Sequence, residues 1–429
     1  MNFGQALAEL DGRQPERMVP DLSRITALAD LLDHPELTYP SIHVTGTNGK
    51  TTAARIITSI ACAHGLSTAT YTSPHLGSVT ERLSLCGEPI DEREFADEYQ
   101  RLVPYLRQVD AMGERVTYFE TLTALAYLWF ADKPASLGVF EVGMGGVWDA
   151  TNLVAGDVAV MCPIALDHPE LGSTIAEVAE EKAGIVKKGK VAVCRVQPEA
   201  ALDVIRRRCR DAGAHLLLED EDWTLADRTP AVGGQVLSVR GIHRSYEGLQ
   251  LALFGEHAAR NAAASIVAME AFLDRALSED ATRQALAQTS SPGRLEVAAR
   301  HPLVVLDGAH NPAAAKALAT ALPEAFAWED LFLVLACSAN KDIPGIVSEL
   351  RTLPRITEVH VASHSSPRSA PAEVVADACR AGGLDPEQHP SVKEALQAAR
   401  DRASDADLIL VTGSLYTVAD ARPILISDG

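Results

Sequence analysis

The sequence predicts an α/β protein with mostly parallel sheets in two domains, at about residues 1–290 and 291–429. Short β-branched apolar runs alternate with Ala- and Leu-rich stretches of helical spacing, as expected for strands joined by crossover helices. A small polar stretch with Pro and Gly, Thr289 to Arg294, is typical of a linker. A second, shorter alternation of the same kind follows it, which predicts a smaller second domain.

The individual elements follow from these patterns in chain order. Before the linker we expect strands at 41–46, 67–73, 136–143, 157–168 and 190–196. Helices are expected at 51–65 (ending at Gly65), 118–132, 174–186 and 259–273. Residues 215–255 alternate and contain turn glycines, which predicts antiparallel hairpins. After the linker, strands are expected at 302–311, 331–338, 358–363 and 408–414, each followed by a helical stretch.

Composition narrows the possible partners. The chain has 429 residues, 47% of them hydrophobic, and a net charge of −20. That charge argues against a nucleic-acid binder or a protein of anionic membranes, which needs a basic face. No apolar run approaches the ~20 residues of a membrane span. We therefore expect small-molecule substrates and, for oligomeric state, a monomer.

The cysteines indicate a reducing compartment. There are seven, and none forms a C-x-x-C pair. We expect neither a zinc cluster nor a disulfide framework, and interpret most of them as small buried residues. The first residues lack a basic start followed by an apolar core, so we expect no signal peptide. These features favour the cytoplasm.

The stretch "HVTGTNGKTTAARI" has the context of a phosphate-binding loop. Gly46-x-x-Gly49-Lys50-Thr51 stands between a predicted strand and a predicted helix, and its N–H groups would make an anion site. Lys50 would neutralise phosphate charge, and a hydroxyl of Thr51 or Thr52 could reach Mg²⁺. The alternative is a structural turn. The strand before the loop and the helix after it favour nucleotide binding, and we expect the nucleotide to be ATP with Mg²⁺.

Polar residues also follow other predicted strands, where ligands bind in open α/β sheets. They are Ser73 and His75, Glu141, and Asp167 with His168. Glu141 could ligate Mg²⁺, or it could be a strand-end cap. His168 alone could be a satisfied turn histidine. Lys182 on a Glu-rich helix is by itself typical of a solvated face.

The second domain has similar candidates. Asp307 and His310 stand just past a predicted strand, and Arg294 lies in the linker, where it could reach phosphates. Each is a weak signal individually. The residues alone thus indicate a two-domain α/β protein that binds ATP and Mg²⁺.

The ordered set of motifs resembles the folylpolyglutamate synthase/dihydrofolate synthase family of the Mur ligase superfamily. The matching segments run from about residue 20 to residue 422 and include "HVTGTNGKTT", "YTSPHLGSVTERLSL", "EVGMGGVWDATN", "IALDH", "EEKAGI", "GEHAARNAA", "SPGRLE", "LDGAHNP", "NKDIPGI" and "VTGSLYTVADAR". The resemblance implies a P-loop ATPase domain and a Rossmann-like glutamate ligase domain. It also implies that ATP converts a substrate carboxylate into an acyl phosphate, which the amine of L-glutamate then attacks.

The resemblance also implies residue roles. Gly46, Thr47, Asn48, Gly49, Lys50, Thr51 and Thr52 would hold phosphates, and Asn261, Arg294, Asp307 and His310 would clamp ATP. Two Mg²⁺ sites are implied, one with Ser73 and Glu141 (and Thr51) and one with Glu141, His168 and Lys182. Lys50, Glu141, His168 and Lys182 would be the catalytic set, with Lys182 carbamylated. Arg24, Phe119, Glu120, Asp149, Asn152, Lys341 and Asp342 are the candidates for the substrates.

Departures from the family pattern concern the acceptor acid. Lys50 is followed directly by Thr51, as in Mur ligases. Val147 stands where the family usually has Arg, the turn after His168 is one residue short, and Ala258 replaces a common Gln. The family resemblance makes dihydropteroate and folyl polyglutamates the expected acceptors, and these departures open the question of another acid. The alternatives are a related ligase with a non-folate acceptor and a non-catalytic nucleotide-binding protein.

Overall fold

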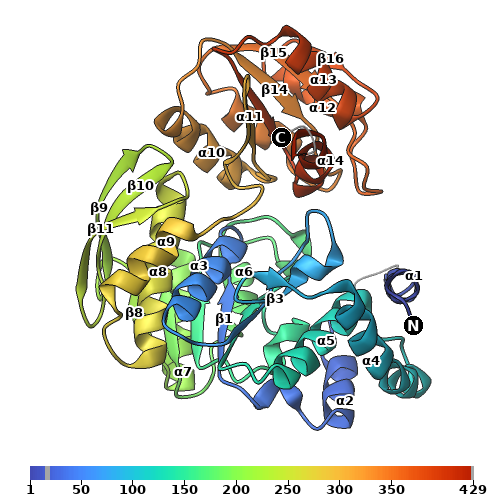
Figure 1. The fold of residues 1–429 in the computed structure, drawn as a ribbon, viewed down its shortest axis with the longest axis vertical. Coiled ribbons are helices and arrows are strands. Elements are labelled where there is room, and N and C mark those ends of the chain that lie inside the picture. Colours follow the sequence, from blue (N-terminus) through green and yellow to red (C-terminus); the bar gives the residue numbers. More distant parts are fainter. Residues whose placement is uncertain (15–19, 427–429) are drawn as a thin grey trace. The chain divides into compact units, whose positions relative to one another are not determined.

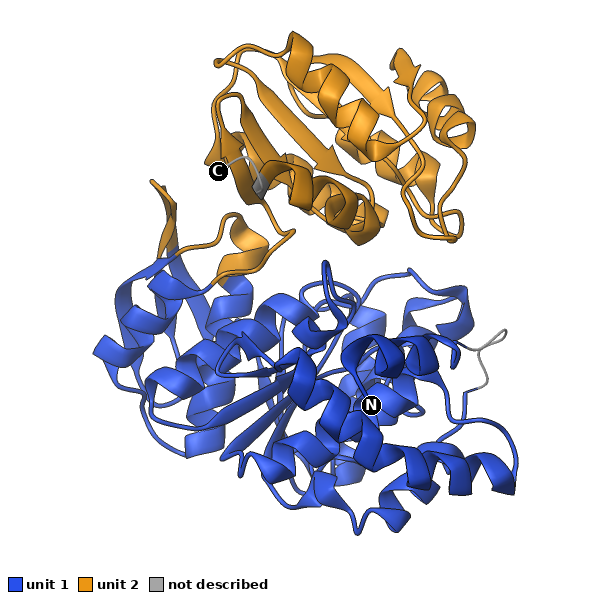
Figure 2. Ribbon diagram, turned by 45° about the vertical axis from the view of Figure 1, so that its right-hand side comes forward, with its two compact units in different colours: residues 1–227, 237–251, 260–289 blue, residues 228–236, 252–259, 290–429 orange. Residues whose placement is uncertain are grey.

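The structure is a computed structural model that describes residues 1–14 and 20–426. The chain divides into two compact units (Figure 2). The first contains residues 1–227, 237–251 and 260–289, and the second contains 228–236, 252–259 and 290–429. Each unit is built on a mostly parallel sheet with helices packed against it (Figure 1), which confirms the predicted α/β class. No helix in the described ranges is long and apolar enough to cross a membrane.

The first unit holds an eight-stranded sheet in the order β4-β3-β2-β5-β1-β6-β7-β8. Its parallel strands are β1 (Ser41–Thr45), β2 (Thr68–Tyr71), β5 (Leu137–Glu141), β6 (Val158–Met161), β7 (Val191–Cys194) and β8 (His215–Leu218). Two short antiparallel strands, β3 (Leu83–Leu85) and β4 (Glu88–Pro89), close one edge. The carboxyl ends of β2, β5, β1 and β6 therefore lie side by side.

Helices in this unit bury apolar residues against the sheet or against one another. They are α1 (Phe3–Asp11), α2 (Ser23–Leu31), α3 (Lys50–Ala63), α4 (Glu92–Met112), α5 (Tyr118–Asp132), α6 (Ile175–Ala183), α7 (Glu199–Ala212), α8 (Glu256–Leu273) and α9 (Glu279–Gln288). One apolar core joins α1, α2, α4 and α5 to β2 and β3, and a second joins α6 and α7 to β6 and β7. At about 25 cal/mol per Å² of buried apolar surface, such cores supply the main stabilisation.

The predicted hairpin region begins later than expected. Residues 215–218 form β8, a parallel strand of the main sheet, so the prediction is wrong there. The run HLLL follows α7 and pairs with the apolar β7. Its last two residues, Leu217 and Leu218, point to opposite faces and are both buried, as in a parallel sheet covered on both sides, so no alternation marks the strand. The remaining strands, β9 (Thr224–Ala231), β10 (Gly234–Arg240) and β11 (Ser245–Leu251), form a separate three-stranded sheet joined by short loops.

The second unit contains a six-stranded sheet in the order β12-β13-β17-β14-β15-β16. Its strands are β12 (Glu296–Arg300), β13 (Leu303–Leu306), β14 (Leu331–Leu335), β15 (Ile356–Val361), β16 (Pro386–Gln388) and β17 (Leu408–Thr412), and only β12 is antiparallel. Its helices are α10 (Pro312–Ala325), α11 (Ile343–Leu350), α12 (Ala372–Ala381), α13 (Val392–Arg402) and α14 (Leu415–Ile426).

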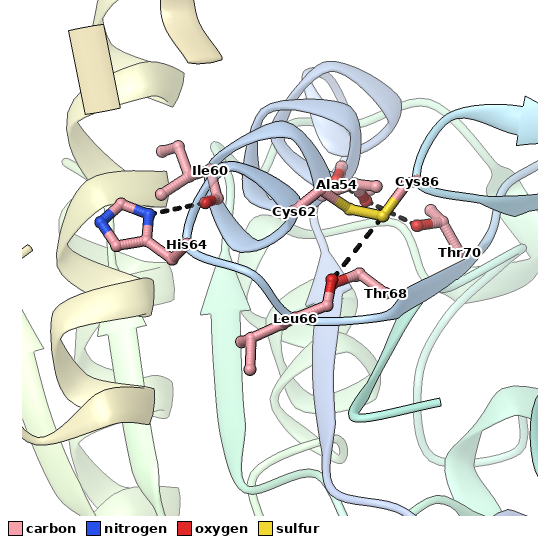
Figure 3. Close-up of a disulfide and its surroundings, with 9 residues drawn as sticks. Ala54, Ile60, Cys62, His64, Leu66, Thr68, Thr70 and Cys86 are labelled. Atoms are coloured by element: carbon pink, nitrogen blue, oxygen red, sulfur yellow. Dashed lines mark hydrogen bonds between the residues drawn. A yellow bond between two sulfur atoms is a disulfide. The ribbon is translucent and has the colours of Figure 1, made fainter. Parts of the chain in front are cut away.

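Cys62 and Cys86 form a disulfide, so the expectation of no disulfide is wrong for this pair (Figure 3). The β2–β3 hairpin carries Cys86 back toward the end of α3, where its N–H bonds the Thr68 carbonyl. The two Cα atoms come within 5.8 Å. The other five cysteines are buried and free, which confirms the interpretation of most of them.

Candidate active site

The glycine loop lies between β1 and α3, and its last glycine, Gly49, is the N-cap residue of α3. Gly49 takes φ +90°, and a Cβ there would meet the Asn261 amide at 2.8 Å. Gly46 passes so close to Cys162 that a Cβ would lie 2.6 Å from its side chain. As the N-cap residue, Gly49 has no side chain with which to cap the helix. The backbone N–H groups at this end and the helix dipole favour an anion here.

Lys50 folds back over the loop that it follows. Its Nζ donates to the carbonyl oxygens of Gly46 at 3.1 Å and Thr47 at 3.3 Å. Thr47 in turn fixes the loop to the segment after β6, since its N–H bonds the Pro163 carbonyl and its hydroxyl bonds the Ala165 carbonyl. The loop is therefore held in shape by the Lys50 ammonium group and by the segment that follows β6.

Three oxygen-bearing groups meet beside the loop. Glu141 ends the buried strand β5 and is 2% exposed. The Thr51 hydroxyl donates to its carboxylate, 2.8 Å from Oε1 and 3.0 Å from Oε2. The Ser73 N–H, just after β2, donates to Oε2 at 3.1 Å. The start of α3 and the ends of β2 and β5 thus bring Thr51, Ser73 and Glu141 together, and the Glu141 carboxylate with the Thr51 hydroxyl offers the hard oxygen donors that Mg²⁺ prefers.

Lys182 reaches the same loop from the last turn of α6. It is 4% exposed, and its Nζ donates to the Gly46 carbonyl at 2.9 Å. Burial, together with the nearby charge of Lys50, lowers the pKa of Lys182 to about 7, against the opposing effect of Asp167 and Asp149. The solvated-face alternative is therefore wrong for this lysine.

His168 lies on the segment after β6 that Thr47 fixes to the loop. Its Nε2 lies 3.3 Å from the Asp167 carboxylate. Asp167 also acts electrostatically on Lys182. The structure thus places Asp167 and His168 beside the glycine loop, half-buried, at the end of the neighbouring strand.

Asn261, on α8, is buried against the loop. Its side-chain oxygen accepts from Arg195 at 2.7 Å, and its amide lies 3.5 Å from the Gly49 carbonyl. Arg195 is not among the residues predicted from the sequence. It follows an apolar run at the end of β7, so the strand-end pattern that indicates Glu141 applies to it as well. Arg195 and Arg260 both contact the buried Glu219, whose carboxylate balances the charge of Arg195 in part.

The substrate candidates of the first unit fall into two groups. Arg24 and Glu120 pair with each other, buried, with Arg24 Nε 3.0 Å from both carboxylate oxygens. Phe119 packs near Tyr71 and against Gly143, where a Cβ would lie 2.4 Å from its ring.

Asp149 and Asn152 shape the loop that follows Glu141. Asp149 accepts from the N–H groups of Met144 and Thr151. Asn152 donates to the Val147 carbonyl at 3.1 Å. Val147 itself is 46% exposed, and its N–H bonds the Glu181 carbonyl on α6. The position that departs from the family pattern is thus an open one next to the helix of Lys182.

In the second unit, Asp307 follows β13 and is buried. It accepts from the N–H groups of Leu295 and Ala309. Burial raises the pKa of Asp307, while Arg294 and His310 oppose that shift. The structure therefore brings Arg294, Asp307 and His310 into one electrostatic group.

Lys341 and Asp342 lie at the start of α11. The Asp342 carboxylate caps this helix by accepting from the Gly345 N–H at 2.9 Å. A Cβ at Gly345 would lie 2.7 Å from Pro312, so α11 begins against the start of α10. Lys341 and Asp342 are therefore placed beside the helix that follows His310.

Comparisons with known proteins agree with this arrangement. The model of the Mur ligase middle domain matches residues 44–269, and that of the Mur ligase glutamate ligase domain matches 293–415. The chain is 38% identical to the dihydrofolate synthase/folylpolyglutamate synthase of Mycobacterium tuberculosis, over 98% of this chain and 93% of the relative. It is 32% identical to the Bacillus subtilis protein of the same name, over 98% of each.

Solved structures agree as well. The folylpolyglutamate synthase of Mycobacterium tuberculosis complexed with ADP has a TM-score of 0.94 at 38% identity, covering 99% of this chain and 98% of that one. An Escherichia coli protein in complex with DHPP and ADP has a TM-score of 0.90 at 29% identity, over 100% and 98%. The chain belongs to the dihydrofolate synthase/folylpolyglutamate synthase family of Mur ligases.

Proposed function

We propose that this ligase uses ATP to join L-glutamate to dihydropteroate, to folyl polyglutamates, or to both. The observation that carries the proposal is the meeting of Thr51, Ser73, Glu141 and Lys182 at the glycine loop, in a chain of this family. The similarity to dihydrofolate synthase/folylpolyglutamate synthases, one of which is solved with ADP bound, supports ATP as the nucleotide.

Phosphate binding is assigned to residues Gly46 to Thr52. The N-terminus of α3 offers backbone N–H donors, and Lys50 offers a positive charge that can leave its carbonyl partners for phosphate oxygens. Asn261, Arg294, Asp307 and His310 are proposed as further ATP contacts, on the family resemblance.

Two Mg²⁺ sites are proposed on the same basis. Thr51, Ser73 and Glu141 would hold one ion, and Glu141, His168 and Lys182 would hold the other. Bound Mg²⁺ would neutralise phosphate charge during transfer. The amine of Lys182 is not itself a ligand for a hard cation. Its carbamylation, in which Nζ adds to CO₂ and loses a proton, would supply the missing carboxylate oxygens at a buried position.

The chemistry is then a matter of placement and charge. An ionised substrate carboxylate needs no base to attack the γ-phosphorus, and the bond from that phosphorus to ADP breaks. The glutamate amine, after losing a proton, attacks the acyl carbon, and phosphate leaves with the bonding pair. The α3 N–H groups would stabilise negative charge in the first step from their fixed positions, and Lys50 would do so after turning toward the phosphate oxygens.

The acceptor is proposed to contact Arg24, Phe119, Glu120, Asp149 and Asn152, with Lys341 and Asp342 near the substrates. Val147 is exposed and stands where the family usually has Arg. The loss of this cation is the observation that favours the alternative, a non-folate acceptor acid, so the acceptor requires a direct test. We also propose that the enzyme acts as a monomer in the cytoplasm, without nucleic-acid partners. Exposed Cys86 would then exchange with cellular thiols.

The test is ATP turnover with L-glutamate and three acceptors in parallel: dihydropteroate, tetrahydrofolate and a UDP-muramyl acid. We expect glutamate-dependent phosphate release with at least one pterin and none with the muramyl acid. No release with either pterin would contradict the folate assignment. Release without glutamate or acceptor would indicate only a nucleotide hydrolase.

A further inference from the structure

A cluster of metal-ligating side chains lies at one edge of the second sheet, on β15 and β16. His360 and Glu387 are register partners on these parallel strands, so their side chains emerge on the same face. His389 follows β16, and its N–H bonds the Val361 carbonyl. One ligand atom from each of His360, Glu387 and His389 lies within 4.8 Å of the others.

The spacing of these atoms suits a shared cation. His360 Nδ1 lies 3.0 Å from His389 Nε2, and Glu387 Oε1 lies 3.8 Å from the same nitrogen. In a tetrahedral zinc site with Zn–N near 2.0–2.1 Å, neighbouring donor atoms are about 3.3 Å apart. Without a metal, the two imidazoles must share one proton, with one ring donating and the other accepting.

The surrounding groups orient the donors toward this point. Glu358, also on β15, places Oε2 at 3.2 Å from His360 Nε2. The His360 ring is fully buried, and Nε2 makes no well-aligned hydrogen bond with any described residue. A proton on Nε2 facing this carboxylate leaves Nδ1 free to bind a metal, the arrangement in which a carboxylate supports a metal-bound histidine.

Arg402, at the end of α13, holds the two carboxylates without covering the donors. Its Nη1 lies 2.8 Å from Glu358 Oε2 and 2.8 Å from Glu387 Oε2. Glu387 Oε1 therefore stays available toward His389. With neutral imidazoles, the two carboxylates and Arg402 sum to a charge of −1, which favours a cation.

The cluster is separate from the candidate active-site residues of this unit. Asp307 and His310 follow β13, and three strands, β17, β14 and β15, separate β13 from β16. At about 4.8 Å per strand, that distance is roughly 19 Å across the sheet.

We propose that His360, Glu387 and His389 bind one divalent transition-metal ion of the zinc class. Two imidazole nitrogens and a carboxylate oxygen suit such ions, whereas Mg²⁺ and Ca²⁺ prefer oxygen donors alone. Glu387 is half-exposed, which leaves room for water as a fourth ligand. The ion ties the short edge strand β16 to β15 and so stabilises the end of the sheet.

The test titrates Zn²⁺ into the full-length, metal-stripped protein in millimolar Mg²⁺, with Co²⁺ absorption as a second readout. We expect one Zn²⁺ per chain at this site, a tetrahedral Co²⁺ spectrum and a higher Tm with Zn²⁺. His389→Ala should weaken the binding at least tenfold, and Glu387→Gln, at a half-exposed position, should weaken it as well. Glu358→Gln tests the positioning of His360 and should lower affinity without removing the Co²⁺ spectrum.

His215→Ala, an exposed histidine on β8, is the matched control and should leave the titration unchanged. Zinc that binds equally to the wild type and to folded His389→Ala and Glu387→Gln would overturn the proposal. So would a wild type that shows neither Zn²⁺ binding nor a Tm shift.

Discussion

Replacing Lys182 by Met should stabilise the protein while abolishing turnover. Lys182 is buried, and its pKa falls from 10.5 to about 7 mainly because burial penalises the ammonium form. At about 1.4 kcal/mol for each pH unit, the lysine costs the metal-free native state roughly 4 kcal/mol at neutral pH. Met has a similar volume and no charge. Losing the hydrogen bond to the Gly46 carbonyl destabilises the variant by about 1 kcal/mol, so a net stabilisation of about 3 kcal/mol is expected.

The sign of the pH dependence follows from the same shift. Between pH 7 and 10.5 the unfolded chain binds more protons at Lys182 than the folded chain does. Wild-type stability should therefore rise with pH over this interval, and its deficit against Lys182→Met should shrink toward pH 10.

The assay is urea unfolding and Tm of EDTA-treated protein, with turnover measured in Mg²⁺ and bicarbonate. Lys182→Met should gain roughly 3–5 °C in Tm and lose at least about 100-fold in kcat. Lys188→Met, an exposed neighbour, should change neither. A Lys182→Met protein that is less stable than wild type would refute the electrostatic reasoning, and one with intact turnover would refute the catalytic role.

Three further predictions concern other parts of the first unit. Cys86→Ser removes a disulfide that joins residues 24 apart, which should lower the free energy of unfolding by about 3 kcal/mol. The Tm of the variant should equal that of the reduced wild type. A lower Tm in the variant than in the reduced wild type would point to another cause. Val147→Arg adds a cation at an exposed position and should lower KM for an anionic pterin acceptor several-fold without changing KM for ATP. An unchanged acceptor KM would show that residue 147 does not interact with the acceptor. Burial lowers the pKa of His43 to about 3, so the folded state holds the imidazole neutral while the unfolded chain protonates it below pH 6.5. The free energy of unfolding should therefore fall as the pH drops below 6.5. His43→Gln should therefore reduce the loss of stability between pH 6.5 and 5 by about 2 kcal/mol in urea titrations, and equal slopes for both proteins would contradict this.

The fold and the main elements of the site were accessible from sequence because their signals are local. A β-branched run before Gly46 and a helical pattern after Lys50 specify the loop, and Glu141 ends an apolar strand. What was missed depends on distant pairing. The run HLLL at residues 215–218 carries no mark of its parallel partner, so the sequence pattern groups it with the hairpins that follow. Nothing in the spacing of Cys62 and Cys86 reveals that the β2–β3 hairpin brings them together.

Lys182 illustrates the limit at the site itself. Its helix has the charge pattern of a solvated face, and only the family resemblance indicated a role before the structure placed Nζ at the Gly46 carbonyl. Arg195 shows the converse, because its strand-end position was visible in the sequence, but its contact with Asn261 on α8 was not.

The central claim, that this chain uses ATP to activate a carboxylate, is tested most directly by isotope transfer. The accepted pterin acid is labelled with oxygen-18 in its carboxylate and turned over with ATP and L-glutamate, and the released phosphate is analysed by mass. An acyl-phosphate route predicts that one labelled oxygen passes into each phosphate released. Amide formation with unlabelled phosphate, or with AMP and pyrophosphate as products, would contradict the account.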